Sequence, residues 1–179
     1  MSYEVKSRTY QITYFSPNGH AEKLAASLRE LLPPDTRVEA LDKKTQAGAD
    51  VQLVGFDLKM VDLHTLPLNI VTYLKGLDGK TVFLFATVPF RTDDVLSRQV
   101  HKNVTAALPA QCDYRGLHLC PAQSPDMLVE GFRNVVQRNP SNIRAKHWLE
   151  RCEQAQGHPN EADSQALCRF ARHVLKLDT

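Results

Sequence analysis

Two nearly continuous apolar runs place the strongest constraint on what this chain can fold into. Residues 51–56 read VQLVGF and residues 81–87 read TVFLFAT. Strands that helices cover on both faces of a parallel sheet have this composition, whereas a half-exposed strand alternates apolar and polar residues. Between the runs, residues 69–77 can form a short helix that ends at the Asp78-Gly79 turn. The pattern predicts two central strands joined by a helical crossover.

The remainder of the chain continues this alternation of strand and helix. Short β-rich segments occur at residues 10–15, 37–41 and 114–119, and apolar residues at helical spacing occur between the predicted strands. Because such crossovers are right-handed, the predicted fold class is α/β: a doubly wound five-stranded parallel sheet in the order 2-1-3-4-5, with helices on both faces.

Helical patterns dominate the chain after the last predicted strand. Ser124 and Pro125 are placed as an N-cap and a first-turn proline. Asn160 and Asp163 are spaced as a capping pair at the start of the final helix. Trp148, the only tryptophan, lies in a more polar helix, and we expect it to pack that helix on the domain.

The length of 179 residues is that of one ordinary domain. We therefore treat residues 1–179 as a single domain, with residues 1–8 as a flexible N-terminus and residues 124–179 as its C-terminal helical part. We expect this domain to be a monomer.

Charge and hydropathy exclude several classes of partner. The 22 basic and 20 acidic residues give a net charge of +2, which is too balanced for the dense phosphate contacts of nucleic-acid binding. No apolar run approaches the roughly 18 residues of a membrane span. The four cysteines form no C-x-x-C pair and the first residues do not resemble a secretion signal, so the expected location is cytoplasmic.

Ligands of such a sheet bind beyond the carboxyl ends of the strands, where the strand order reverses. The loops at residues 16–21, 57–67 and 88–93 meet there. The first reads SPNGHA and leads into a helix, whose unpaired N–H groups and dipole favour an anion such as a phosphate. This edge is the predicted ligand site.

The first loop resembles the FMN phosphate loop of flavodoxins. The usual pattern there is Ser or Thr, any residue, Thr or Ser, Gly, any residue and Thr, before a helix that begins with Glu or Lys. Ser16 and Gly19 match it, as does EKLA at residues 22–25. Other segments are also similar, so that the resemblance covers roughly residues 9–177: VGF at 54–56 followed by Pro67, DGK at 78–80 and FAT at 85–87. The resemblance implies a flavodoxin-like fold with FMN as the cofactor.

The resemblance also implies which residues would contact FMN. They lie in the three loops: Ser16, Asn18, Gly19, His20 and Ala21 for the phosphate, and Met60, Thr87, Val88, Pro89 and Phe90 beside the ring. Leu58 and His64 are further candidates for the ring wall, and Lys59 and Arg91 would add positive charge. The alternative is that His20 faces solvent and that Met60 and Phe90 anchor their loops on the domain. No catalytic residue and no metal are implied, because the flavin supplies the chemistry.

Two hydroxyl positions of the phosphate loop depart from the pattern: Asn18 has an amide in place of a hydroxyl, and Ala21 offers no side-chain donor. In addition, Pro17 removes one backbone N–H. Each lost hydrogen bond to a charged group costs about 1.5–3 kcal/mol, which weakens FMN binding by about one to two decades. His20 could compensate with a donor or a positive charge.

Other chemistry has less support. His118 and Cys120 share one face of a predicted strand, but an inert buried thiol is the more common state of such a cysteine, and His-x-Cys alone is not a metal site. The first predicted strand ends without the acidic residues of a phospho-receiver domain. A G-x-G-x-x-G dinucleotide motif is absent.

Three functions therefore stay open. The first is an FMN-binding electron carrier that exchanges electrons with a partner redox enzyme. The second, suggested by the degenerate loop, is a flavodoxin-fold accessory or binding module that has lost FMN. The third is an FMN-dependent reductase of a small organic acceptor, and we expect a carrier rather than an enzyme with its own substrate.

Overall fold

The structure, a computed structural model, describes residues 8–59, 65–90 and 94–177. Five strands form one sheet in the order β2-β1-β3-β4-β5, and each neighbouring pair is parallel. The predicted fold class and strand order are confirmed. The strands are β1 (Tyr10–Phe15), β2 (Arg37–Ala40), β3 (Val51–Asp57), β4 (Thr81–Val88) and β5 (Asp113–Pro121).

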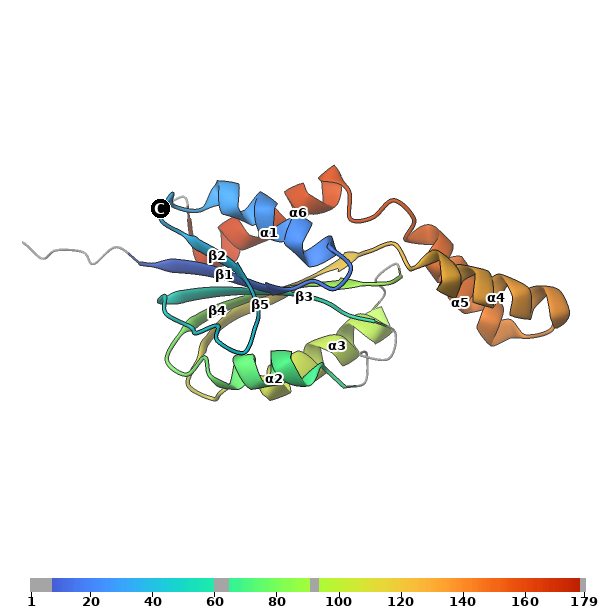
Figure 1. Ribbon diagram of the computed structural model, residues 1–179, viewed down its shortest axis with the longest axis horizontal. Coiled ribbons are helices and arrows are strands. Elements are labelled where there is room, and N and C mark those ends of the chain that lie inside the picture. Colours follow the sequence, from blue (N-terminus) through green and yellow to red (C-terminus); the bar gives the residue numbers. More distant parts are fainter. Residues whose placement is uncertain (1–7, 60–64, 91–93, 178–179) are drawn as a thin grey trace, which may run out of the picture.

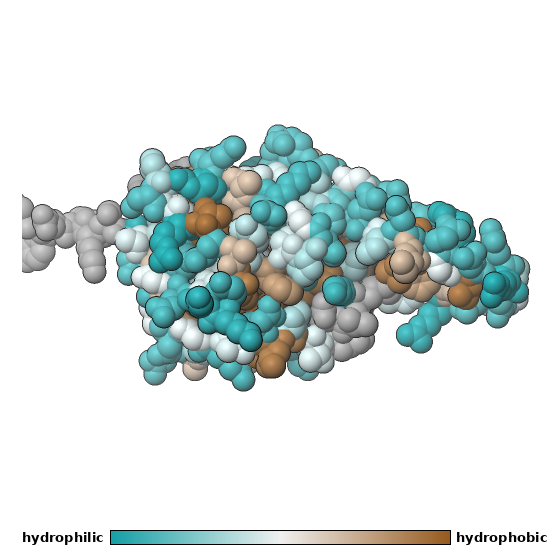
Figure 2. Space-filling view, in the orientation of Figure 1, coloured by the Kyte–Doolittle hydropathy of each residue, from teal (hydrophilic) through white to brown (hydrophobic). Residues whose placement is uncertain are grey.

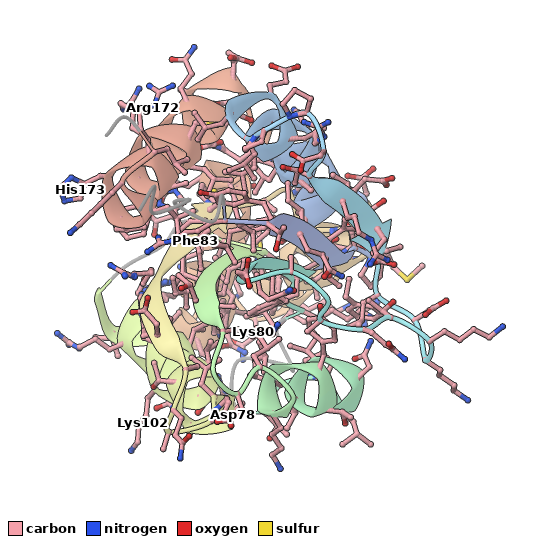
Figure 3. The ribbon with its side chains drawn as sticks, turned by 90° about the vertical axis from the view of Figure 1, so that its left-hand side faces the viewer. Asp78, Lys80, Phe83, Lys102, Arg172 and His173 are labelled. Atoms are coloured by element: carbon pink, nitrogen blue, oxygen red, sulfur yellow. The ribbon has the colours of Figure 1, made fainter. Side chains whose placement is uncertain are left out.

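Helices cover both faces of this sheet. Figure 1 shows α1 and α6 on one face and α2 and α3 on the other. The helices in the described part of the chain are α1 (His20–Leu31), α2 (Leu68–Lys75), α3 (Asp94–Ala107), α4 (Asp126–Arg138), α5 (Ile143–Gln154) and α6 (Glu161–Leu175). Figure 3 shows the same two layers from the edge where the strands begin, with Phe83 of β4 between them.

The apolar runs form the middle of the sheet, as predicted. All residues of β3 are buried, and all of β4 except Thr81. One core cluster packs α1 and α6 on the sheet through Leu24, Leu28 and Leu167, while a second packs the other face. Gly55 of β3 allows Phe85 to lie directly across it, since a Cβ atom there would come within 2.2 Å of the Phe85 ring.

The two predicted helix caps have different outcomes. Asn160 and Asp163 form a capping box at the start of α6, which confirms the prediction. Ser124 does not cap α4, because Pro125 is the N-cap residue and no side chain caps it. The Ser124 hydroxyl is buried and instead donates to the Pro89 carbonyl at 2.6 Å, so that it connects the segment after β5 to the segment after β4.

Helices α4 and α5 form a hairpin that projects beyond the carboxyl ends of the strands (Figure 1). Figure 2 shows hydrophobic patches on this projection, where Met127, Val135 and Ile143 are exposed. Of the N-terminal segment expected to be flexible, positions 1–7 lie outside the described residues. Within the described ranges, no helix is long and apolar enough to cross a membrane.

Candidate functional site

The loop between β1 and α1 lies at the predicted ligand edge. Gly19 is the N-cap residue of α1 and has a φ of 79°, a left-handed conformation that glycine adopts without steric cost. Its N–H donates to the Ser16 carbonyl at 3.2 Å, which closes a tight turn. This turn brings the first N–H groups of α1 and the Ser16 hydroxyl next to the end of β3.

The side chain of Asp57, the last residue of β3, occupies this cradle. Its carboxylate accepts four hydrogen bonds: from Ser16 Oγ at 2.8 Å and Asn18 N at 3.1 Å on Oδ2, and from Ala21 N and Thr87 Oγ1, both at 2.7 Å, on Oδ1. Asp57 is 2% exposed. A buried carboxylate is stable in such a place because charge-assisted hydrogen bonds and the dipole of a helix N-terminus replace its hydration.

These contacts decide whether an FMN phosphate fits the loop. The phosphate would need the same donors, and the Ser16 hydroxyl already donates to Asp57 and accepts from Glu22 N at 3.1 Å. A phosphate beside the buried carboxylate would also meet like charge, and two unit charges 4 Å apart repel by about 1 kcal/mol in water and about 4 kcal/mol at an effective dielectric constant of 20. The residues present do not fit an FMN phosphate while Asp57 holds this position.

The end of β4 and the two residues after it are also held by hydrogen bonds within the chain. Thr87, Val88, Pro89 and Phe90 are all buried. The Val88 carbonyl accepts from Phe90 N and Ala122 N, both at 2.8 Å. The Pro89 carbonyl accepts the Ser124 hydroxyl. The contact of these residues with a flavin ring stays a prediction.

Phe90 in particular has an apolar partner within the protein. Its ring, 1% exposed, meets the ring of Trp148 edge to face with 5.8 Å between centroids, and the Arg151 guanidinium lies 5.9 Å from the centre of the Phe90 ring. Trp148 therefore packs α5 on the domain, as expected. These contacts favour the interpretation of Phe90 as a loop anchor.

Of the other predicted site residues, His20 and Leu58 lie in the described part of the chain. His20 is the first residue of α1 and is partly buried, and its side chain makes no hydrogen bond to the described residues; its role toward a phosphate stays a prediction. Leu58 is 2% exposed and donates its N–H to the Thr87 carbonyl at 2.9 Å. Met60, His64 and Arg91 lie outside the described residues.

The role of Asp57 was missed by sequence reasoning. The signal was a single acidic residue that closes an otherwise apolar strand at the ligand edge, VQLVGF followed by Asp. Three of its four donors come from the segment that joins β1 to α1 and from the first turn of α1, and the fourth, Thr87, from the end of β4; the closest in sequence is 30 residues away, so no local pattern connects them.

Cys120 and His118 of β5 do not form a reactive pair. Burial, with a smaller contribution from Asp163, raises the pKa of the Cys120 thiol to about 12, so it carries little thiolate at neutral pH. Burial lowers the pKa of His118, and the charge of Asp163 partly opposes this shift. Within the described ranges, no group of three or more His, Cys, Asp or Glu residues could hold a metal ion.

Comparisons with known proteins identify the family of this chain. The flavodoxin domain family matches residues 11–172. The chain is 18% identical over 168 residues to the flavodoxin-like domain-containing protein BilS of Clostridioides difficile (strain CD3), which covers 92% of this chain and 94% of that protein. A protein of the same name from Clostridium symbiosum (strain WAL-14163) is 23% identical over 180 residues, with 90% and 93% covered.

A solved structure shares the fold. It is a short-chain flavodoxin associated with a bacterial microcompartment, 14% identical, with a TM-score of 0.58 over 97% of this chain and 100% of that one. At this identity the likeness shows the fold alone. The family match extends over nearly the whole described chain, and together with the strand order it shows that the chain belongs to the flavodoxin domain family.

Proposed function

We propose that this chain is a flavodoxin-fold accessory module of a redox enzyme, which acts through protein contact and does not hold FMN in its phosphate loop. The observation that carries the proposal is the Asp57 carboxylate, which accepts hydrogen bonds from Ser16, Asn18 and Ala21, the loop residues that would bind the phosphate. An anion that belongs to the chain cannot diffuse away, so FMN would have to displace a buried group before it could bind.

The α4–α5 hairpin supports a role in protein binding. Phe132, Val135, Ala145 and Trp148 line one hollow on the hairpin, and apolar side chains that gather on a surface in this way are typical of protein interaction sites. Arg144 and Lys146 follow Ile143 in the first turn of α5, and Arg138 ends α4. The complementary partner is a redox enzyme with an apolar patch and an acidic rim, because opposite charges steer docking and fix its orientation.

An FMN-dependent electron carrier is the second candidate. It is favoured by the family, whose members typically bind FMN, and by the part of the phosphate loop that the chain keeps: Ser16, the left-handed Gly19 and the first turn of α1. For this function Asp57 would have to rotate out of the cradle when the phosphate enters. The partner enzyme, a monomeric state and the exclusion of nucleic acid and membranes stay predictions.

The visible absorption spectrum of the purified protein, followed by a fluorescence titration with FMN, separates the two candidates. The accessory module is colourless and gives no saturable change at FMN concentrations up to about 100 times a typical micromolar Kd. A yellow protein, or saturable binding at micromolar FMN or below, would overturn the proposal in favour of the carrier.

A further inference from the structure

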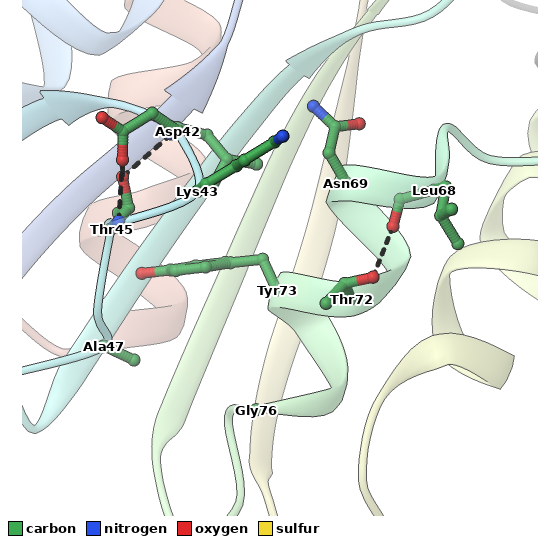
Figure 4. A pocket seen from close by; sticks show the side chains of 10 residues that line it. Asp42, Lys43, Thr45, Ala47, Leu68, Asn69, Thr72, Tyr73 and Gly76 are labelled. Carbon is green, nitrogen blue, oxygen red and sulfur yellow. Dashed lines mark hydrogen bonds between the residues drawn. The ribbon is translucent and has the colours of Figure 1, made fainter.

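A cavity of about 780 Å³ lies between the loop after β2 and helix α2, and Asp57 is not among the residues that line it. Ligand pockets for small molecules have volumes of about 300–1,000 Å³. Figure 4 shows the cavity from close by. Its lining is formed by Leu41, Asp42, Lys43, Thr45 and Ala47 on one side and by Leu68, Asn69, Thr72, Tyr73 and Gly76 on the other.

The aromatic ring of Tyr73 forms the fixed wall of this cavity. Tyr73 is 9% exposed, and its hydroxyl lies 3.0 Å from Thr13 Oγ1 and donates to Gln52 Oε1 at 3.0 Å. These bonds lie on the sheet side, so the ring cannot rotate away from α2 without breaking them. An aromatic face held in this way favours flat apolar ligands.

The loop that forms the opposite wall, residues 41–47, is held by Gln11 and Gln52, and Gln52 also accepts from the Tyr73 hydroxyl. Gln11 Nε2 donates to the Gln46 carbonyl at 2.9 Å, and Gln11 Oε1 accepts from Gly48 N at 2.9 Å and from Gln52 Nε2 at 3.1 Å. Gln52 therefore connects the loop wall to the Tyr73 wall. Both sides of the cavity are positioned before any ligand arrives, which reduces the entropy lost on binding.

Charge at the opening selects the class of ligand. Asp42 directs its carboxylate into its own turn, where it accepts from Lys44 N at 2.7 Å and Thr45 N at 2.8 Å, and these hydrogen bonds, that of Lys44 first, lower its pKa. Lys43 makes no ion pair with the described residues, and Figure 4 shows its side chain extending above the Tyr73 ring toward Asn69. At the opening, the Lys43 ammonium group and the Asn69 side-chain amide therefore lie near the ring of Tyr73.

We propose that this cavity binds a small organic anion, with a flat apolar body against Tyr73 and its anionic group at Lys43 and Asn69. The site is independent of the proposed accessory function, because none of its lining residues contacts Asp57, Ser16 or Ala21 in the described hydrogen bonds. A protein with no FMN and an FMN carrier could each have it.

Fluorescence titrations with two dyes test the proposal. The first dye is 8-anilinonaphthalene-1-sulfonate, an aromatic anion, and the second is N-phenyl-1-naphthylamine, its uncharged analogue. We expect both to bind saturably to the full chain. Lys43→Gln should weaken binding of the sulfonate by about two- to fivefold, since an exposed charge contact is partly screened, and should leave the uncharged dye unchanged. Lys44→Gln, on the same loop outside the lining, is the matched control and should change neither dye.

Thr72→Trp locates the dyes. Thr72 is exposed and lines the cavity, so an indole there should fill the space and abolish binding of both dyes, whereas Thr105→Trp on the exposed side of α3 should not. Absence of saturable binding, retained binding in Thr72→Trp, or equal weakening by Lys43→Gln and Lys44→Gln would each overturn the proposal.

Discussion

The stability of the protein should depend strongly on the Asp57 carboxylate. Asp57→Asn keeps the side-chain volume but replaces one acceptor oxygen with an NH2 group. Each carboxylate oxygen accepts one hydroxyl and one backbone N–H: Thr87 and Ala21 on Oδ1, Ser16 and Asn18 on Oδ2. A hydroxyl can turn and accept from the new amide, but a backbone N–H cannot. Whichever oxygen is replaced, one backbone N–H loses its acceptor.

The magnitude follows from these contacts. The amide should turn its NH2 toward Asn18, which is exposed and can bind water, so this cost lies in the lower half of the roughly 1–3 kcal/mol range for an unsatisfied group. Loss of a negative charge at the N-terminus of α1 adds about 0.3–1 kcal/mol. We therefore expect Asp57→Asn to lower the free energy of unfolding by about 1.5–3 kcal/mol, or the Tm by about 3–12 °C.

Urea unfolding and differential scanning calorimetry measure this change. Asp126→Asn, which removes an exposed carboxylate from the first turn of α4, is the control and should cost no more than about 1 kcal/mol.

Asp57→Ala tests the cradle with an external anion, because it removes the carboxylate and leaves its four hydrogen-bond donors without an acceptor. Orthophosphate at one hundred times its Kd should then raise stability by about 2.7 kcal/mol relative to sodium chloride of equal ionic strength.

The wild-type protein should not respond to orthophosphate in this way, because its own carboxylate holds the donors. The reasoning is refuted if Asp57→Asn is as stable as the wild type, or if orthophosphate stabilises the wild type and Asp57→Ala equally.

Three further predictions concern the sheet. Gly55→Ala should destabilise the protein severely in urea unfolding, because its Cβ would meet the Phe85 ring at 2.2 Å, whereas Gly131→Ala in α4 meets nothing within 4 Å and should add up to about 1 kcal/mol; equal effects would contradict the packing. Burial lowers the pKa of His118, so the unfolded chain binds a proton more readily, and stability should fall as the pH drops below about 6.5; His118→Gln should reduce that fall, and an unchanged pH profile would count against it. Cys120, with a pKa of about 12, should react with 5,5′-dithiobis(2-nitrobenzoate) only after unfolding, so Cys120→Ala should leave the number of fast-reacting thiols in the native protein unchanged, and the loss of one would show that the thiol is accessible.

The fold could be predicted from sequence because its signals are local. The apolar run that became β3 is buried at every position, and the strand order follows from right-handed crossovers between such runs. The capping box of α6 was also predictable, since Asn160 and Asp163 are three residues apart.

The candidate site depends on contacts that no local pattern encodes. The strand order confirms that β1, β3 and β4 are neighbours, but the group that fills the cradle at the end of β3 is Asp57, whose donors lie 30 to 41 residues away in sequence. Similarly, Ser124 forms a hydrogen bond to a carbonyl 35 residues earlier, which outweighs its local capping preference. Tertiary contacts at the site therefore override propensities that were sound for the isolated segments.

The affinity of the wild-type protein for FMN relative to riboflavin tests most directly whether its phosphate loop is closed. Riboflavin has the same ring and lacks the phosphate, so the ratio of the two Kd values isolates the contribution of the loop. With Asp57 in the cradle, the two ligands should bind equally weakly or not at all, and Asp57→Ser should gain a preference for FMN. Tighter binding of FMN than of riboflavin by the wild type, by tenfold or more, would contradict a cradle occupied by the Asp57 carboxylate.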